Sequence, residues 1–119
     1  MVRSIRGAIT VEHNDKEEIL RATELMLKEI IDKNAVVCED MVHMIFTVTN
    51  DLDTAFPAVA ARNMGITNVP LMCMNEIPVK GALQMCIRVM ITVNSDKQLS
   101  DIRHIYLREA VKLRPDLAE

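Results

Sequence analysis

Aromatic side chains are scarce in this chain of 119 residues, which has one tyrosine, two phenylalanines and no tryptophan. Proteins that bind single-stranded nucleic acid stack the bases on aromatic side chains, so this scarcity argues against that class. Positive charge is not in excess either, because the formal net charge is −3, and we expect no nucleic-acid partner. No apolar run approaches the length that spans a bilayer, and we therefore expect no membrane partner.

Glycine and proline are also few, at three and four residues, while half of the residues are apolar. This composition excludes a disordered or collagen-like chain. A chain of this length buries enough surface for one hydrophobic core, and we expect a single domain over residues 1–119.

Cysteine is limited to Cys38, Cys73 and Cys86, an odd number at spacings that match neither zinc nor thioredoxin-type sites. The first residues lack the hydrophobic region of a secretion signal. We therefore expect reduced thiols, no bound metal and a cytoplasmic location.

Runs of β-branched and alternating apolar residues predict strands over 2–11, 41–49 and 69–74, and a long strand over about 83–93. The strand over 41–49 has apolar residues on both faces and is therefore expected to be central in a sheet. A last extended region is predicted over 104–115.

Two helices are predicted between these strands. Apolar residues at steps of three and four indicate a long amphipathic helix, which begins after the capping-box pattern of Asp15 and Glu18 and ends near Asn34. Residues 57–64 are typical of a short helix, with proline in the first turn and Gly65 as the stop. The order predicts an α+β fold, a two-layer α/β sandwich whose mixed sheet of about five strands carries both helices on one face.

Arginine within apolar strands is the unusual feature of this sequence. Arg6 lies in one strand, and Arg88 lies on a strand face that has no other charge. Because an unpaired buried charge is very costly, each arginine must be solvated or bound to an anion. Exposure to water, or a pair with a carboxylate such as Glu76, explains either arginine alone. Two of them, together with Arg62 and Arg114, favour a small-anion site.

Familiar catalytic motifs are missing, since no Ser–His–Asp set, glycine-rich phosphate loop or metal-spaced cluster is present. His13, His43 and His104 are better explained as surface or structural residues. Cys73 and Cys86 have no motif that supplies an activating base. Arginines with one glutamate and one tyrosine suit a reaction that needs only orientation and electrostatic stabilisation.

Several motifs together resemble the trimeric, mixed α/β class of chorismate mutases, which is distinct from the all-helical class. The resemblance runs nearly from end to end of the chain. The matching stretches are IRGAITVE at 5–12, AFPA at 55–58 with Arg62, VP at 69–70, CMNE at 73–76, CIRVM at 86–90, IRHIYL at 102–107 and LRPDL at 113–117.

The resemblance implies a Claisen-type sigmatropic rearrangement of chorismate to prephenate, without a cofactor or metal, in phenylalanine and tyrosine biosynthesis. By motif, Arg88 contacts the ether oxygen, where negative charge grows as the C–O bond breaks. Arg6 binds a substrate carboxylate, with Tyr106 close by. Glu76 accepts a hydrogen bond from the ring hydroxyl, with Cys73 adjacent to it.

The resemblance also implies a pseudo-barrel homotrimer with three sites at its subunit interfaces. Phe56, Ala58 and Arg62 reach the cleft from the neighbouring subunit, and a C-terminal segment closes over the occupied site. Val59 stands where family members often carry a lysine, which predicts weaker substrate steering or affinity. The further substrate-binding residues implied are Met72, Leu113 and Arg114.

Two other functions are compatible with the same arginines. One is a trimeric imine or enamine deaminase-like enzyme, a family with a similar subunit shape that lacks the motifs at 73–76 and 114–116. The other is a non-catalytic trimer that binds a small dicarboxylate. Fold alone does not separate the three functions, whereas incubation of the protein with chorismate alone does.

Overall fold

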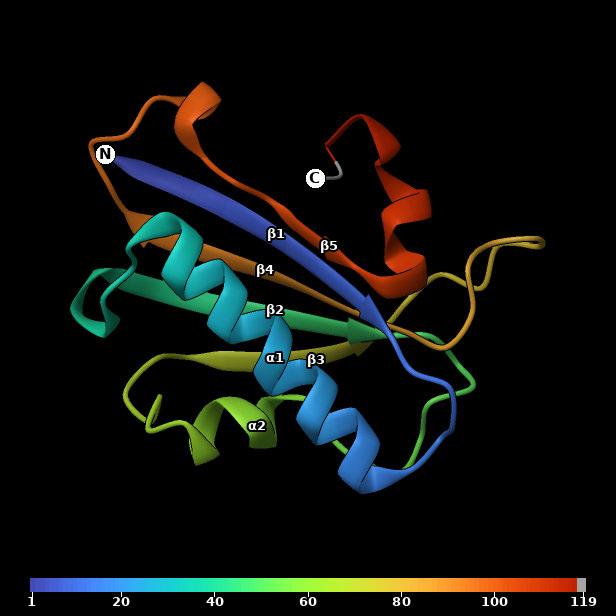
Figure 1. The fold of residues 1–119 in the computed structure, drawn as a ribbon. Helices are drawn as coiled ribbons and strands as arrows, with labels where there is room; N and C mark the ends of the chain where they lie inside the picture. Colours follow the sequence, from blue (N-terminus) through green and yellow to red (C-terminus); the bar gives the residue numbers. More distant parts are fainter. Residues whose placement is uncertain (118–119) are drawn as a thin grey trace.

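The computed structural model describes residues 1–117 as a five-stranded mixed sheet with two α-helices on one of its faces (Figure 1). The α-helices are α1 (Lys16–Asn34) and α2 (Ala58–Asn63). The strands are β1 (Val2–Thr10), β2 (Met41–Val48), β3 (Leu71–Asn75), β4 (Cys86–Asn94) and β5 (Ile105–Leu107). Short 3₁₀ turns cover Cys38–Asp40, Leu99–Asp101, Arg108–Leu113 and Pro115–Leu117.

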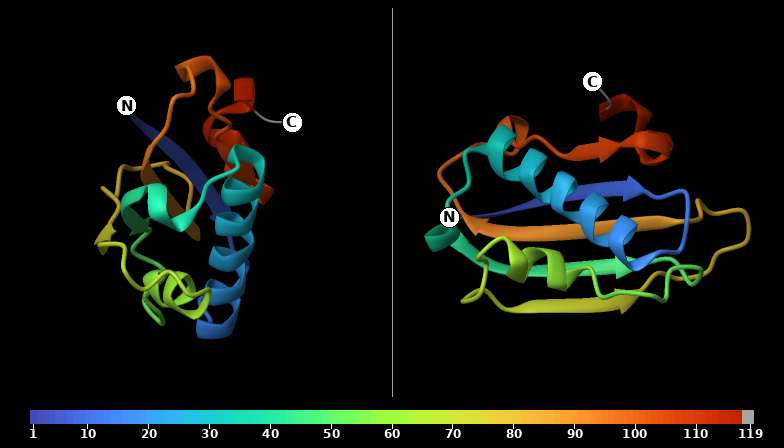
Figure 2. Two further views of the ribbon diagram at one scale, coloured as in Figure 1. Left: turned by 90° about the vertical axis from the view of Figure 1, so that its left-hand side faces the viewer. Right: turned by 60° about the horizontal axis from the view of Figure 1, so that its bottom comes forward.

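The strand order is β3-β2-β4-β1-β5, so β4 lies at the centre of the sheet. It runs antiparallel to β1 and β2, whereas the edge strands β3 and β5 run parallel to β2 and β1. Both α-helices cross the same face, so that among residues 1–117 the other face carries no α-helix (Figure 2). The predicted two-layer α+β architecture is confirmed.

The hydrophobic core lies between the sheet and α1. Side chains of alternate strand residues, such as Ile9 and Ile91, are fully buried against Met26, Leu27 and Ile30 of the helix. The side chains of the other alternate residues in each strand point to the face that carries no α-helix, which we call the open face. Arg6 and Arg88 both belong to it, because their neighbours Ile5 and Val89 point into the core.

The ends of α1 follow the sequence prediction closely. The Asp15 carboxylate accepts the backbone N–H of Glu18 at 3.0 Å, as the N-cap pattern predicts. The second hydrogen bond of a capping box, from the N-cap N–H to the Glu18 carboxylate, is not formed. The Glu18 carboxylate accepts the N–H of Glu12 at 2.7 Å and not that of Asp15. Ala35 ends the helix in the left-handed conformation, with φ of 51°.

Gly7 of β1 lets α1 pack unusually close to the sheet. A Cβ atom at this position would lie 2.5 Å from Cδ1 of Ile30, 3.2 Å from Cγ of Met26 and 3.3 Å from Cγ1 of Val89. All of these neighbours are buried, so none can move away without disturbing the core.

We therefore expect Gly7→Ala to lower the free energy of unfolding by about 1–3 kcal/mol, the usual cost of overpacking a core. Urea unfolding at one fixed subunit concentration measures this loss. Ile30→Val removes the nearest atom, so the double variant is expected to lose less stability than the two single losses added together. A Gly7→Ala protein as stable as the parent would show that Ile30 and its neighbours can move to accommodate the added methyl group without loss of packing.

The fourth strand begins at Cys86, not near residue 83 as predicted. Met85 has a positive φ of 55°, which ends the extended backbone before the strand. The Asp51 carboxylate accepts the N–H of Met85 at 3.0 and 3.2 Å, and Oγ1 of Thr49 accepts the N–H of Cys86 at 3.0 Å. Two residues that come just after β2, Thr49 and Asp51, therefore fix where β4 starts.

The prediction of an extended region over 104–115 is correct only for Ile105–Leu107. The chain turns at Arg108, whose φ is 56°, and continues as 3₁₀ turns. Ala110 is fully buried beside Ala8, Cys86 and Tyr106, so this last segment folds back onto the open face of β1 and β4. Strand pairing stops because packing against this small cluster replaces it.

Candidate active site

The candidate site is centred on a row of residues that crosses all five strands on the open face. Arg88 of β4 pairs with Ala8 of β1 and with Thr47 of β2. Ala8 in turn pairs with Tyr106 of β5, and Thr47 pairs with Met74 of β3. Because direct partners in a sheet point to the same side, these side chains lie next to one another, with the Arg88 guanidinium on the central strand.

Arg88 has a carboxylate neighbour but not a tight ion pair. Its Nη1 lies 3.9 Å from Oε2 of Glu76, beyond the distance of a hydrogen bond. Its Nε is buried and has no hydrogen-bond partner among residues 1–117. Buried donors are normally satisfied, so this guanidinium has capacity for a ligand that accepts hydrogen bonds.

Glu76 is held by the strand beside it. Its backbone N–H donates to the carbonyl oxygen of Val48 at 2.9 Å. Oγ1 of Thr47 donates to its Oε1 at 2.8 Å, while Oε2 faces Arg88. The carboxylate is therefore fixed on one side and free to accept a further hydrogen bond on the other.

Arg6, Glu76 and Arg88 line one small cavity of about 190 Å³. Thr47 and Met90 form part of the same wall. Two guanidiniums and one carboxylate around an otherwise apolar hollow give a net positive site for a small anion. These are the three residues that the sequence analysis assigned to catalysis, and the fold brings them together from β1, β4 and the residue after β3.

Tyr106 and the C-terminal segment form a small buried cluster with Ala8 and Cys86, on the β5 side of Arg88. Tyr106 is 7% exposed and packs with Ala8, Cys86 and Ala110, and Leu113 lies against the same cluster. Arg114 is exposed, and its Nε and Nη2 donate to the Asp116 carboxylate at 3.1 and 3.0 Å. The pKa of Arg114 is raised by this pairing, and the pKa of Asp116 is lowered by it.

The cysteines do not form a nucleophilic centre. Burial raises the pKa of the Cys86 thiol, which keeps it protonated, and the nearby Arg88 offsets this only in part. Among residues 1–117, no cluster of three or more His, Cys, Asp and Glu side chains is placed to hold a metal. Over the same residues, no helix is both long and apolar enough to cross a membrane.

The remaining predicted residues lie elsewhere on the subunit. Phe56 and Cys73 line a second, larger cavity of about 350 Å³ between the β2–α2 loop and β3. Cys73 pairs with the core residue Phe46, so its side chain is on the helix face, whereas Met72 is on the open face. Ala58 is buried and Arg62 is exposed on α2, and neither reaches the Arg88 cavity within one subunit.

Comparison of the chain with known proteins identifies the family to which it belongs. The family model of type I chorismate mutase matches residues 2–117. The chain belongs to this family. Its activity is accordingly that of a chorismate mutase, an isomerase that converts chorismate to prephenate in aromatic amino acid biosynthesis, and the deaminase-like and non-catalytic alternatives find no support.

Individual relatives agree along nearly the whole chain. It is 50% identical over 118 residues to the chorismate mutase AroH of Thermus thermophilus, covering 98% of this chain and 97% of that protein. It is 49% identical over 119 residues to the chorismate mutase AroH of Bacillus subtilis strain 168, covering 99% of this chain and 94% of that protein. A solved chorismate mutase from Clostridium thermocellum superposes with a TM-score of 0.89 at 56% identity, over 91% of this chain and 96% of that one.

Two residues that hold members of the candidate site in place were not singled out from the sequence. Thr47 orients Glu76, and His104 accepts the backbone N–H of Arg6 at 2.9 Å through Nδ1. Thr47 shares strand parity with Ile45 and lies in a predicted central strand, which is the only signal the sequence offered. His104 gave none, because its partner is 98 residues away along the chain.

Proposed function

We propose that this chorismate mutase rearranges its substrate in the Arg88 cavity, with Arg88, Glu76 and Arg6 as the catalytic residues. The observation that carries the proposal is the buried, unpartnered Nε of Arg88 beside a loosely paired Nη1. In the rearrangement the ether C–O bond breaks, and negative charge grows on that oxygen. A guanidinium already fixed at this point stabilises the transition state without reorganisation.

The other two groups orient the substrate. Arg6 is a second guanidinium on the same cavity and is suited to a substrate carboxylate, and Tyr106 lies in the row of Arg88 and Ala8. The free side of the Glu76 carboxylate is suited to the ring hydroxyl, since its other oxygen already accepts from Thr47. Holding the chain of reacting atoms in one folded conformer removes much of the entropic barrier of an intramolecular reaction.

The test of the function uses the purified protein and chorismate alone. We expect prephenate to form without any added cofactor or metal, and at the same rate in the presence of a chelator. A requirement for a metal ion or a redox cofactor contradicts the proposal, because the proposed site uses amino-acid side chains alone.

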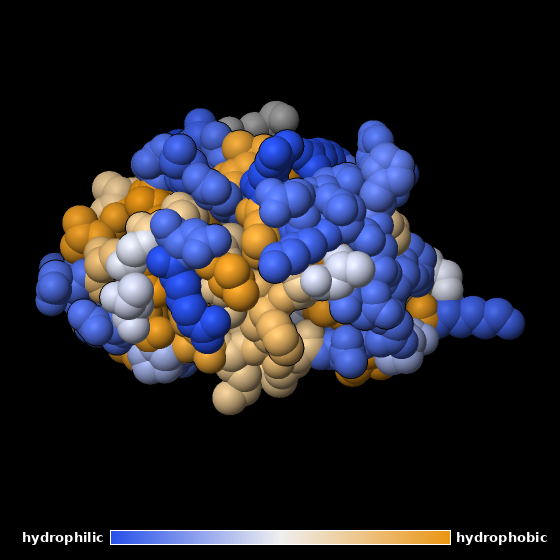
Figure 3. Space-filling view, turned by 90° about the horizontal axis from the view of Figure 1, so that it is seen from below, coloured by the Kyte–Doolittle hydropathy of each residue, from blue (hydrophilic) through white to orange (hydrophobic). Residues whose placement is uncertain are grey.

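We further propose that the working enzyme is a pseudo-barrel homotrimer whose clefts lie between subunits. In one subunit Phe56 is 70% exposed, and Met72 and Met74 are also exposed. Figure 3, which views the side of α2 and the edge strand β3, shows an apolar band between hydrophilic flanks. A large apolar patch of this kind is typical of an interface.

In this assembly Phe56, Ala58 and Arg62 of one subunit complete the Arg88 cavity of the next. Met72 and Cys73, near the same edge, complete the substrate-binding set, and Leu113 and Arg114 close over the cleft from the C-terminal side. Head-to-tail contacts of this type form closed rings when the rotation permits. One buried cluster extends from Ile5 to Ile105, which supports a single domain as the unit of assembly.

The cytoplasm is the proposed compartment. Cys38, Cys73 and Cys86 are all free, and Cys38 is exposed. Exposed free thiols are typical of proteins from reducing compartments.

The pH dependence provides a test of the reaction type. A concerted rearrangement needs no proton transfer, so we expect kcat to be flat between about pH 7 and pH 9 and the solvent deuterium isotope effect on kcat to be close to one. Steady-state rates in light and heavy water measure both. An isotope effect of about two or more, or a bell-shaped kcat profile centred in this range, would indicate an essential acid and base.

A further inference from the structure

A histidine holds the backbone of Arg6 at the point where strand pairing ends. β1 and β5 pair in parallel from Gly7–Ile105 to Ile9–Leu107. Arg6 comes just before this ladder, and its N–H donates to Nδ1 of His104 at 2.9 Å. The imidazole thus takes the place of the strand carbonyl that a longer β5 would offer.

His104 is itself held in place from the other side. The buried Asn34, at the end of α1, accepts the N–H of Arg103 at 2.8 Å through Oδ1 and donates through Nδ2 to the Arg103 carbonyl at 2.9 Å. The same Nδ2 donates to the carbonyl of Ile30 at 2.9 Å. The residue before His104 is therefore anchored to the long helix, and the imidazole position is set by the fold.

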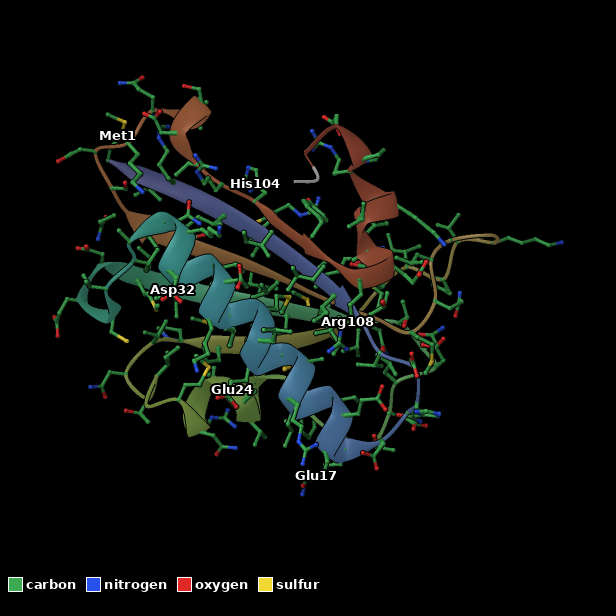
Figure 4. All side chains as sticks on the ribbon, viewed as in Figure 1. Met1, Glu17, Glu24, Asp32, His104 and Arg108 are labelled. Atoms are coloured by element: carbon green, nitrogen blue, oxygen red, sulfur yellow. The ribbon has the colours of Figure 1, made fainter. Side chains whose placement is uncertain are left out.

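Only the neutral imidazole can accept this hydrogen bond, since both ring nitrogens are donors in the protonated form. The guanidiniums of Arg114, from the C-terminal segment, and of Arg6, from β1, act on the ring electrostatically, and Arg114 is itself paired with Asp116. Burial and these two guanidiniums lower the pKa of His104 below 6.5. In Figure 4 the labelled His104 lies beside the path into β5, on the side of the C-terminal segment.

We propose that His104 is a positioning residue for the reaction: its neutral Nδ1 fixes the backbone of Arg6 so that the guanidinium enters the Arg88 cavity, and protonation of the ring releases it. This inference rests on the proposed role of Arg6 in substrate binding. It adds a pH-sensitive element to a reaction that transfers no proton. Activity is therefore retained above the pKa of His104 and lost as the pH falls through it.

The experiment compares His104→Asn with His104→Ala. Asparagine places Oδ1 where histidine has Nδ1, and this acceptor does not titrate. At about pH 7.5 we expect kcat/KM to fall about tenfold in the alanine variant and less than about threefold in the asparagine variant. Between about pH 7 and pH 5, kcat/KM is expected to fall in the parent and much less in His104→Asn. His13→Asn, at an exposed histidine, is the matched control and is expected to behave as the parent.

A second readout is independent of activity. The amide proton of Arg6, followed by NMR, is expected to shift with pH in the parent and to stay constant in His104→Asn. Arg6→Ala separates the two proposals: if that variant keeps full activity, the role of Arg6 fails, while the amide titration still tests the hydrogen bond. The role of His104 is overturned if kcat/KM of His104→Ala lies within twofold of the parent value. It is also overturned if His104→Asn shows the same fall of kcat/KM at acidic pH and the same titration of the Arg6 amide as the parent. If His104→Ala does not fold, the asparagine profile decides.

Discussion

Replacing Arg88 by alanine is expected to lower kcat by about two to three orders of magnitude while changing KM far less. Removing one preorganised donor from a developing oxyanion typically costs about 3–4 kcal/mol. In the proposed site, Arg6 and other groups hold the substrate carboxylates, so we expect substrate binding in the ground state to depend little on Arg88. The ether oxygen needs the guanidinium only as its negative charge develops.

Steady-state kinetics on folded, trimeric variants measure this effect. Arg88→Lys is expected to recover only part of kcat, because one ammonium cannot reproduce the planar fork of donors. Arg21→Ala, at an exposed arginine of α1, is the matched control and is expected to leave both constants unchanged. If Arg88→Ala keeps kcat within a few-fold of the parent, Arg88 is structural and the proposed mechanism is wrong.

Mixing two inactive variants is expected to restore activity. In the proposed trimer, Arg62→Ala and Arg88→Ala are each expected to damage every site. After unfolding and joint refolding at equal amounts, a site is intact when Arg88 comes from one parent and Arg62 of the neighbour comes from the other. Random assembly of a ring makes about one site in four intact, so about a quarter of the parent activity is expected to return.

The control mixes Arg6→Ala with Arg88→Ala. Both residues line the cavity of the same subunit, so no combination of these chains contains an intact site. The mixture is expected to stay as inactive as its components. Equal recovery in both mixtures, or full activity of Arg62→Ala alone, would contradict the shared cleft.

The sequence predicted the elements whose signals are local. The cap at Asp15, the apolar stripe of α1 and the stop at Gly65, whose φ is 89°, all depend on residues within a few positions. The start of β4 was missed because it is set by Asp51, 34 residues earlier in the chain. The folding of residues 108–113 was missed because it follows from packing against Ala8 and Cys86, and no nearby residue signals it.

The same distinction applies to the candidate site. Arg6 and Arg88 were identified because a charged side chain within an apolar strand must be solvated or paired, and this requirement is visible from the residue and its immediate neighbours. Glu76 was, from the residues alone, only a possible carboxylate partner, and its role in the site came from the family resemblance. Thr47 and His104 act on Glu76 and Arg6 across strands, and their contacts depend on the register of β2 with β3 and of β1 with β5. Register between distant strands is not written in either strand alone.

The ties at the two ends of the segment between Glu76 and Met85 have a consequence for how this enzyme can change. At one end the N–H of Glu76 is bound to Val48, and at the other the N–H of Met85 is bound to Asp51. Residues 77–81, which lie between these two hydrogen bonds, are exposed, whereas Leu83 packs against the buried cluster of Ala8, Cys86 and Tyr106. Insertions within residues 77–81 are therefore expected to leave Glu76 and Arg88 in place, which makes the tip of this loop suited to grafting new contacts.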